Sequence, residues 1–153
     1  MMRCKPLWPL FFSASLTMFC PVRPNGELHA EEYAQASVQK LVDTSVNYAG
    51  LPLKYPVSGK PEVTALIVTI PVGCSTGWHL HPVPVYAYML EGELLIRTET
   101  GLQKLFRKGD AIVEVMNLKH NGLNSGQTNA RLVVFYTGIE GVPNVIKGDG
   151  GKP

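Results

Sequence analysis

Proline and glycine recur along almost the whole of this chain, and they limit how long any helix or strand can be. The 153 residues include 12 prolines and 15 glycines, which are scattered rather than gathered in one tract. Because proline removes a backbone donor and glycine favours turns, this distribution suits many short strands better than a helical bundle. Hydrophobic residues make up 45% and charged residues 17% of the chain, which allows a folded core and argues against a disordered protein.

The sequence between the turn signals reads as strands. Runs rich in Val, Ile, Leu and Thr occur at residues 62–70, 83–90, 93–98, 102–107, 110–115 and 130–137. Turns that contain Gly, Asn or Ser separate them at a spacing of roughly 8–12 residues, with no long helical pattern among them. We therefore predict a single all-β domain, an antiparallel barrel or sandwich, over residues 56–140.

The first thirty residues have the composition of a secretory signal peptide. Arg3 and Lys5 precede an apolar run at residues 7–20, and a polar stretch follows up to Ala30. The run is shorter than the roughly 20 residues that a membrane helix needs, so we expect cleavage after Ala30. The mature protein would then be periplasmic or secreted, without a stable membrane span. An uncleaved anchor is the alternative.

Removal of residues 1–30 changes the charge and the cysteine content of the chain. The net charge of the whole chain is +2, but three basic residues and one acidic residue lie in the predicted signal peptide, so the remainder is neutral. Nucleic-acid-binding proteins carry a basic patch, and we expect no nucleic-acid partner here. Cys74 is the one cysteine outside residues 1–30, so we expect no intrachain disulfide and interpret Cys74 as a small buried apolar residue.

The segments on either side of the barrel are less clearly patterned. Residues 31–42 have helical spacing of apolar side chains, whereas residues 37–46 also read as a strand. We favour an N-terminal arm or strand over residues 31–55, and in one interpretation it crosses to a partner subunit. Residues 141–153 end in a Gly-rich sequence and are expected to be a frayed tail.

Three histidines lie within the predicted barrel. His79 and His81 are two residues apart in an extended segment, so their side chains point to the same face of a sheet. His120 comes about 40 residues later, after another strand. Three imidazoles from two strands can hold a divalent ion and leave other positions open, although buried histidines are also common without a metal. Because a ligand imidazole must be neutral, metal affinity is expected to fall as the pH drops through about 6.

The histidines are spaced as in a known family. The first group of matching positions is Gly73, His79, His81, Val85 and Gly92, and the second is Gly109, Val115, Asn117, His120 and Asn124. Together they resemble the two motifs of the cupins, over about residues 60–140. The chain departs from the motifs where Val85 replaces the usual Glu, Val115 the usual Pro and Asn117 the usual Gly.

This resemblance implies a cupin-type double-stranded β-helix, or jelly-roll barrel, in a homodimer. It also implies that His79, His81 and His120 are metal ligands inside the barrel. The missing carboxylate at Val85 leaves two possibilities. One is a three-histidine site, similar to those of thiol dioxygenases and diketone-cleaving cupins, with about three positions open to substrate and O₂. The other is a weakened site that holds metal poorly.

Two function classes follow from the resemblance. The first is a metal-dependent oxidoreductase of the dioxygenase type that acts on a small chelating organic substrate, with Fe(II) as the expected ion and Zn, Mn or Ni as alternatives. No catalytic residue beyond the metal ligands is expected. The second class is a non-enzymatic module that binds or senses a small ligand or a metal. It is favoured by the missing carboxylate and by the absence of a clear acid or base.

Two other residues are candidates for the surroundings of the metal. Glu114 could orient a ligand imidazole or act as a base, but we prefer to interpret it as a solvated strand carboxylate. Trp78 is out of phase with the histidines and either walls the mouth of the barrel or covers a dimer face. Tyr86 and Tyr88 alternate with Val85, so they are expected to face outward if Val85 faces the interior.

Overall fold

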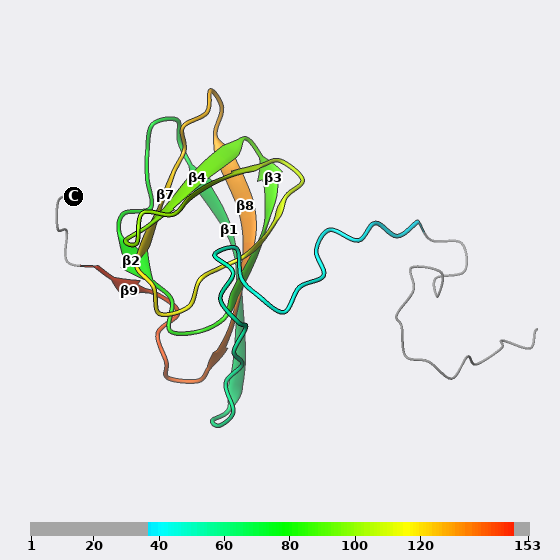
Figure 1. The fold of residues 1–153 in the computed structure, drawn as a ribbon, viewed down its shortest axis with the longest axis vertical. Helices are drawn as coiled ribbons and strands as arrows, with labels where there is room; N and C mark the ends of the chain where they lie inside the picture. Colours follow the sequence, from blue (N-terminus) through cyan, green and yellow to red (C-terminus); the bar gives the residue numbers. More distant parts are fainter. Residues whose placement is uncertain (1–36, 149–153) are drawn as a thin grey trace, which may run out of the picture. The chain divides into compact units, whose positions relative to one another are not determined.

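The computed structural model describes residues 37–148, which form two antiparallel sheets that face each other (Figure 1). The predicted signal peptide, residues 31–36 of the predicted arm and residues 149–153 lie outside the described residues. No helix occurs in the part of the chain that is described. The all-β jelly-roll prediction is therefore confirmed. None of the described segments is a helix long and apolar enough to cross a membrane.

The first sheet has four strands in the order β1-β8-β3-β6. Their bounds are β1 Pro61–Ile70, β8 Ala130–Ile139, β3 Val85–Glu91 and β6 Ala111–Val113. Side chains alternate between buried and partly exposed along β3 and β8, which is the period-2 pattern of a sheet with one face on a core. This sheet supplies much of the apolar interior, including the fully buried side chains of Met89 and Ile112.

The second sheet has five strands in the order β5-β4-β7-β2-β9. Their bounds are β5 Gln103–Arg107, β4 Glu93–Thr98, β7 His120–Leu123, β2 His79–Leu80 and β9 Ile146–Lys147. Leu94, Ile96 and Phe106 point from this sheet into the core between the two sheets. Figure 1 shows β2, β7 and β9 together on the side of the barrel opposite β8. The histidine-bearing strands thus form one wall of the interior.

The six predicted strands are all present, but three short strands are missing from the prediction. β2 and β9 have two residues each, and β7 contains Asn121 and Gly122, which have low strand propensity. His120 begins β7 and does not simply follow a strand. Ile146 and Lys147 pair with β2, so the expectation of a frayed tail is wrong for this part of residues 141–153. In all three cases a neighbouring strand, not local sequence, decides the conformation.

The described part of the predicted arm forms neither a helix nor a regular strand. Residues 37–44 have no assigned structure and are exposed, and Val46 makes an isolated bridge with Pro52. The Tyr48 N–H donates to Val113 O at the edge of β6, and the Tyr48 ring packs edge-on against Phe106 at 5.7 Å between centroids. The arm is therefore attached at Tyr48 to the edge strand β6 of one sheet and to Phe106 of the other. Its crossing to a partner stays a prediction.

The outer face of the four-stranded sheet is apolar. Tyr86 and Tyr88 are half-buried there and alternate with the buried Val85, as predicted. Val63, Ile67 and Phe135 on the neighbouring strands are exposed. The homodimer stays a prediction.

Cys74 is exposed, so its interpretation as a buried residue is wrong. It lies in the turn after β1, where the next residues lead into β2 without covering it.

Candidate metal centre

The strand pairing of β2 and β7 brings the three histidines together. His79 is directly opposite His120 in the register of these strands, and His81 follows one residue after β2. The three ring centroids are 4.4 to 4.9 Å apart. One ring nitrogen from each residue lies within 4.8 Å of the other two. Small rotations of the rings would bring all three nitrogens onto one ion.

Backbone carbonyls fix the orientation and the protonation of all three rings. The Nδ1 atoms of His79, His81 and His120 lie 2.8, 2.8 and 2.9 Å from the carbonyl oxygens of Gly77, Asn144 and Leu118. A carbonyl oxygen only accepts hydrogen bonds, so each neutral ring carries its proton on Nδ1. Each Nε2 therefore keeps its lone pair. Metal-bound histidines are held in this way, with the far nitrogen donating to a carbonyl or a carboxylate.

Burial keeps two of these rings neutral well below neutral pH. The side chains of His81 and His120 are 3% and 2% exposed. Their burial lowers the pKa of each imidazole to about 4, because the charged form would lose its hydration. The expected fall in metal affinity near pH 6 therefore shifts towards pH 4 for these two ligands. At pH 7 both rings are already in the form that binds metal.

The residues present fit a divalent metal ion. His120 Nε2 is buried and has no hydrogen-bond partner. A buried lone pair without a partner costs free energy unless something occupies it. Three neutral imidazole nitrogens on one wall are a donor set that zinc, iron, nickel and manganese accept. We conclude that the chain can hold a divalent metal at this point.

Glu114 lies beside the histidines, so its interpretation as a solvated carboxylate is wrong. Its side chain is 10% exposed, and its Oε2 is 3.6 Å from His120 Nε2. The Glu114 N–H donates to Val85 O, which places the residue opposite Val85 and on the same inward face. Burial raises the pKa of this carboxyl to about 7. The sequence placed Glu114 on the predicted strand 110–115, but it did not reveal the pairing with β3 that sets residue 114 opposite Val85.

Trp78, unlike Glu114, does not line the cavity around the histidines. It is half-buried, directly before β2, and its carbonyl oxygen accepts a hydrogen bond from Gly148 N at 2.8 Å. Since residues 78 and 79 alternate along an extended segment, Trp78 points away from the face that the histidines share.

The histidines line a cavity of about 80 Å³ between the two sheets. Its other walls are mostly apolar, with Val85, Ile96 and Leu132 among them. Tyr136 also lines the cavity, and its ring meets His81 edge-on at 5.5 Å between centroids. Burial, and to a lesser extent the charge of Glu114, raises the pKa of the Tyr136 phenol, so it remains a donor. We did not predict this residue, although its inward position follows from alternation along residues 130–137.

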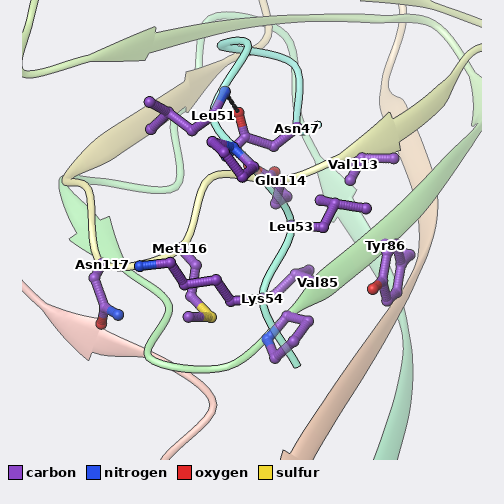
Figure 2. Close-up of a pocket in the computed structure, with 12 residues that line it drawn as sticks. Asn47, Leu51, Leu53, Lys54, Val85, Tyr86, Val113, Glu114, Met116 and Asn117 are labelled. Atoms are coloured by element: carbon purple, nitrogen blue, oxygen red, sulfur yellow. Dashed lines mark hydrogen bonds between the residues drawn. The ribbon is translucent and has the colours of Figure 1, made fainter. Parts of the chain in front are cut away.

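A larger pocket of about 250 Å³ lies next to this cavity, between the arm and the ends of β3 and β6. Figure 2 shows Lys54 from the arm and Asn117 after β6 among the residues around it. Val85 and Glu114 line both spaces. These two side chains therefore form the wall between the outer pocket and the histidines.

The family model for the cupin domain matches residues 66–136, a segment that contains all three histidines. Residues 66–136 form a cupin domain. The cupin motif positions also agree with the backbone. Gly92 has a φ of 69°, and Asn117, at a position where the motif has Gly, has a φ of 57°. Asn is one of the few residues with a side chain that adopts this left-handed conformation readily.

Solved cupin-fold structures are similar to this chain at low sequence identity. A conserved protein with a double-stranded β-helix domain from Klebsiella pneumoniae is 16% identical to this chain, with a TM-score of 0.50. The match covers 61% of this chain and 89% of the Klebsiella chain. The DMSP lyase DddQ from Ruegeria pomeroyi is 18% identical to this chain, with a TM-score of 0.52. The match covers 60% of this chain and 45% of the lyase.

A third structure, from Bacillus halodurans, is 20% identical to this chain, with a TM-score of 0.48. The match covers 54% of this chain and 67% of the Bacillus chain. The chain spans less than half of the length of the lyase. No curated protein sequence matches the chain. At these identities the shared feature is the cupin fold.

Proposed function

We propose that this cupin is a metal-dependent oxidoreductase of the dioxygenase type, which acts on a small chelating organic substrate. His79, His81 and His120 would hold the metal, and Fe(II) is the expected ion. The observation that carries the proposal is the hydrogen bond from each Nδ1 to a backbone carbonyl. These bonds leave three Nε2 lone pairs on one wall of a small, mostly apolar cavity, which is what an open-sided metal site needs.

The metal would supply Lewis acidity and the ability to react with O₂. The chain's own residues have other tasks. Apolar side chains such as Ile96 and Leu132 exclude water from the cavity, which strengthens every polar interaction there. The Tyr136 phenol keeps its proton because burial raises its pKa, so it can donate a hydrogen bond to an anionic substrate oxygen. A dioxygenase places both atoms of O₂ in the substrate and needs no separate reductant.

The two spaces limit the size of the substrate. A cavity of about 80 Å³ accommodates a few atoms next to the metal, since a water molecule occupies roughly 30 Å³. The rest of a substrate would occupy the outer pocket of about 250 Å³. Lys54 and Asn117 line that pocket and could bind a carboxylate or another anionic group. A small anionic chelator fits this arrangement better than a large aromatic one.

The test is O₂ uptake by the iron-loaded protein. The chain is purified without chelator or affinity-tag metal, loaded anaerobically with one equivalent of Fe(II), and mixed with small thiols or diketones in an O₂ electrode, with a flavonol as the large aromatic comparison. Uptake with one of these classes is expected, and it should disappear when all three histidines are replaced by Ala. Full iron occupancy without uptake for any chelating substrate would contradict the proposal.

The same preparation tests the alternative function, a binding module. Elemental analysis of protein from its native source should give about one equivalent of iron if the enzyme proposal is right. Tight binding of a small ligand that is unchanged in His79→Ala would favour the module, because its ligand would then not need the metal.

A further inference from the structure

The cupin motif has a glutamate at the position where this chain has Val85. Another glutamate, Glu114, lies opposite Val85 on the neighbouring strand. Val85 begins β3, and its carbonyl oxygen accepts a hydrogen bond from the Glu114 N–H at 3.0 Å. Residues paired in this way point to the same face of a sheet, with Cβ atoms roughly 4.5–5.5 Å apart. Both side chains line the histidine cavity. A glutamate at 114 therefore brings its carboxylate into the same part of the barrel as a glutamate at 85 would.

The contact between Glu114 and His120 needs a proton or a metal ion between the two side chains. His120 donates from Nδ1 to Leu118 O, so Nε2 is an acceptor, and an ionised carboxylate is also an acceptor only. Glu114 Oε2 and His120 Nε2 nevertheless face each other at 3.6 Å, and both atoms are buried without a hydrogen-bond partner. Two buried acceptors at this distance repel each other unless a proton or a metal ion lies between them.

The geometry also decides against the outer role that carboxylates often have in metal sites. A carboxylate that orients a ligand imidazole accepts the N–H on the side of the ring away from the metal. In all three histidines a backbone carbonyl accepts that N–H. Glu114 lies instead on the Nε2 side of His120, which is the side where the metal would be.

We propose that Glu114 is the fourth protein ligand of the metal, in place of the glutamate that the cupin motif has where Val85 stands. This inference rests on the proposed function in one respect, which is that the three histidines bind a metal. A three-histidine, one-carboxylate site has a net charge of +1 and leaves two positions of an octahedral ion open. Those two positions suit a bidentate substrate, or one substrate atom together with O₂.

The ligand's position in the sheet has a consequence for access. Glu114 lines both the histidine cavity and the outer pocket, where Figure 2 labels it among the lining residues. A substrate that comes from the outer pocket would therefore meet the metal on the side of its carboxylate ligand. Val85 lines both spaces as well, so a glutamate at position 85 would present its carboxylate on the same side of the site.

The experiment compares Co(II) binding by four forms of the full chain, with the absorption spectrum and the dissociation constant as readouts. Glu114→Gln has nearly the same shape but lacks the charge, and it should bind Co(II) at least 10- to 100-fold more weakly than the unchanged chain. Its visible absorption should also change, because the carboxylate is lost from the set of ligands. Glu140→Gln removes an exposed carboxylate paired with Lys60 and is the matched control, with no change expected.

The fourth form is the double variant Val85→Glu/Glu114→Val, which moves the carboxylate back to the position that the motif has. It should recover Co(II) affinity to within a few-fold of the unchanged chain, and it carries the test if Glu114→Gln does not fold. Equal affinity and an equal spectrum for the unchanged chain and Glu114→Gln would overturn the role of Glu114 but leave the three-histidine site intact. Failure of the unchanged chain to bind Co(II) would overturn both proposals.

Discussion

At the scale of single residues, Asn117 shows how a motif position survives the loss of its usual glycine. Its φ of 57° is in the left-handed region, where a Cβ normally costs about 1–2 kcal/mol. The Asn117 N–H also donates to His81 O at 2.8 Å, so this turn holds the chain next to one of the three histidines. The backbone conformation, rather than the glycine itself, is what the site needs.

Substitutions at Asn117 test this interpretation. Asn117→Ala should lower the free energy of unfolding by about 1 kcal/mol, because Ala adopts positive φ less readily than Asn. Asn117→Gly should change it by only a few tenths of a kcal/mol. Urea denaturation of the metal-free protein measures both values. A larger loss for Gly than for Ala would mean that side-chain contacts of Asn117, and not its φ, stabilise the turn.

Asn124 is the second motif residue whose role is structural. It is fully buried, and its Nδ2 donates to Ile70 O and to Thr128 O, both at 2.8 Å. Its Oδ1 accepts a hydrogen bond from Gly126 N at 3.0 Å. This one side chain therefore connects the end of β1 to the loop between β7 and β8.

We predict that Asn124→Ala lowers the free energy of unfolding by about 2–4 kcal/mol, because it leaves buried backbone groups without partners. Asn124→Asp should cost at least as much, since it turns a carboxylate oxygen towards two carbonyl oxygens. Thermal and urea unfolding measure both. A loss below about 0.5 kcal/mol for the Ala variant would show that water replaces the side chain.

The sequence predicted the three histidines correctly as neighbours but did not reveal the position of Glu114. Alternation within one extended segment places His79 and His81 on one face, and the cupin motif adds His120. The position of Glu114 depends on the register between β3 and β6, which brings residue 114 opposite residue 85. Such a register is set by packing across the whole sheet, so a single sequence does not contain it in readable form.

At the scale of elements, strand prediction worked where a run was long and apolar. The β4 bounds, Glu93–Thr98, agree with the predicted residues 93–98, and the ten-residue strand β8 was predicted at residues 130–137. The prediction did not find β9, because Ile146 and Lys147 are too short a run to give a periodic signal. Only their pairing with His79 and Leu80 makes them a strand.

The C-terminal segment 141–148 contacts the candidate metal centre. Asn144 O accepts the hydrogen bond from His81 Nδ1, and the Asn144 side chain donates to Thr64 Oγ1 at 3.0 Å. β9 then pairs with β2, and Gly148 N donates to Trp78 O. This segment therefore holds His81 in its tautomer and covers the outer edge of β2.

Truncation after Glu140 should lower Co(II) affinity about 10-fold, since loss of the group that orients a ligand imidazole typically costs 10- to 100-fold. Truncation after Gly148 keeps every described contact of the segment and is the control, with no change expected. Isothermal titration at pH 7, with circular dichroism to verify folding, makes the comparison. Equal affinity for both truncated forms would contradict a role for Asn144 O.

At the scale of the whole molecule, the buried ionisable groups connect folding to pH. The folded-state pKa of His81 and of His120 is about 4, below the ordinary value of 6.5. Between these values the unfolded chain binds protons that the folded chain does not, so the folded state loses stability as the pH falls from 6.5 to 4. Glu114 acts in the opposite sense, because its folded-state pKa of about 7 is above the ordinary 4.5.

The two histidines together outweigh the one carboxyl. With about 1.4 kcal/mol for each pKa unit, the metal-free protein should lose on the order of 3 kcal/mol of stability between pH 7 and pH 4. Glu114→Gln removes the opposing contribution of the carboxyl. The stability of this variant should therefore fall by roughly a further 3 kcal/mol over the same pH interval.

Urea denaturation at several pH values, in the presence of a chelator, measures both curves. If the curves are parallel, Glu114 does not take up a proton on folding. If stability is flat with pH in the Gln variant, the histidines are not buried in their neutral form, and the water-excluding cavity that the dioxygenase proposal depends on does not exist in solution.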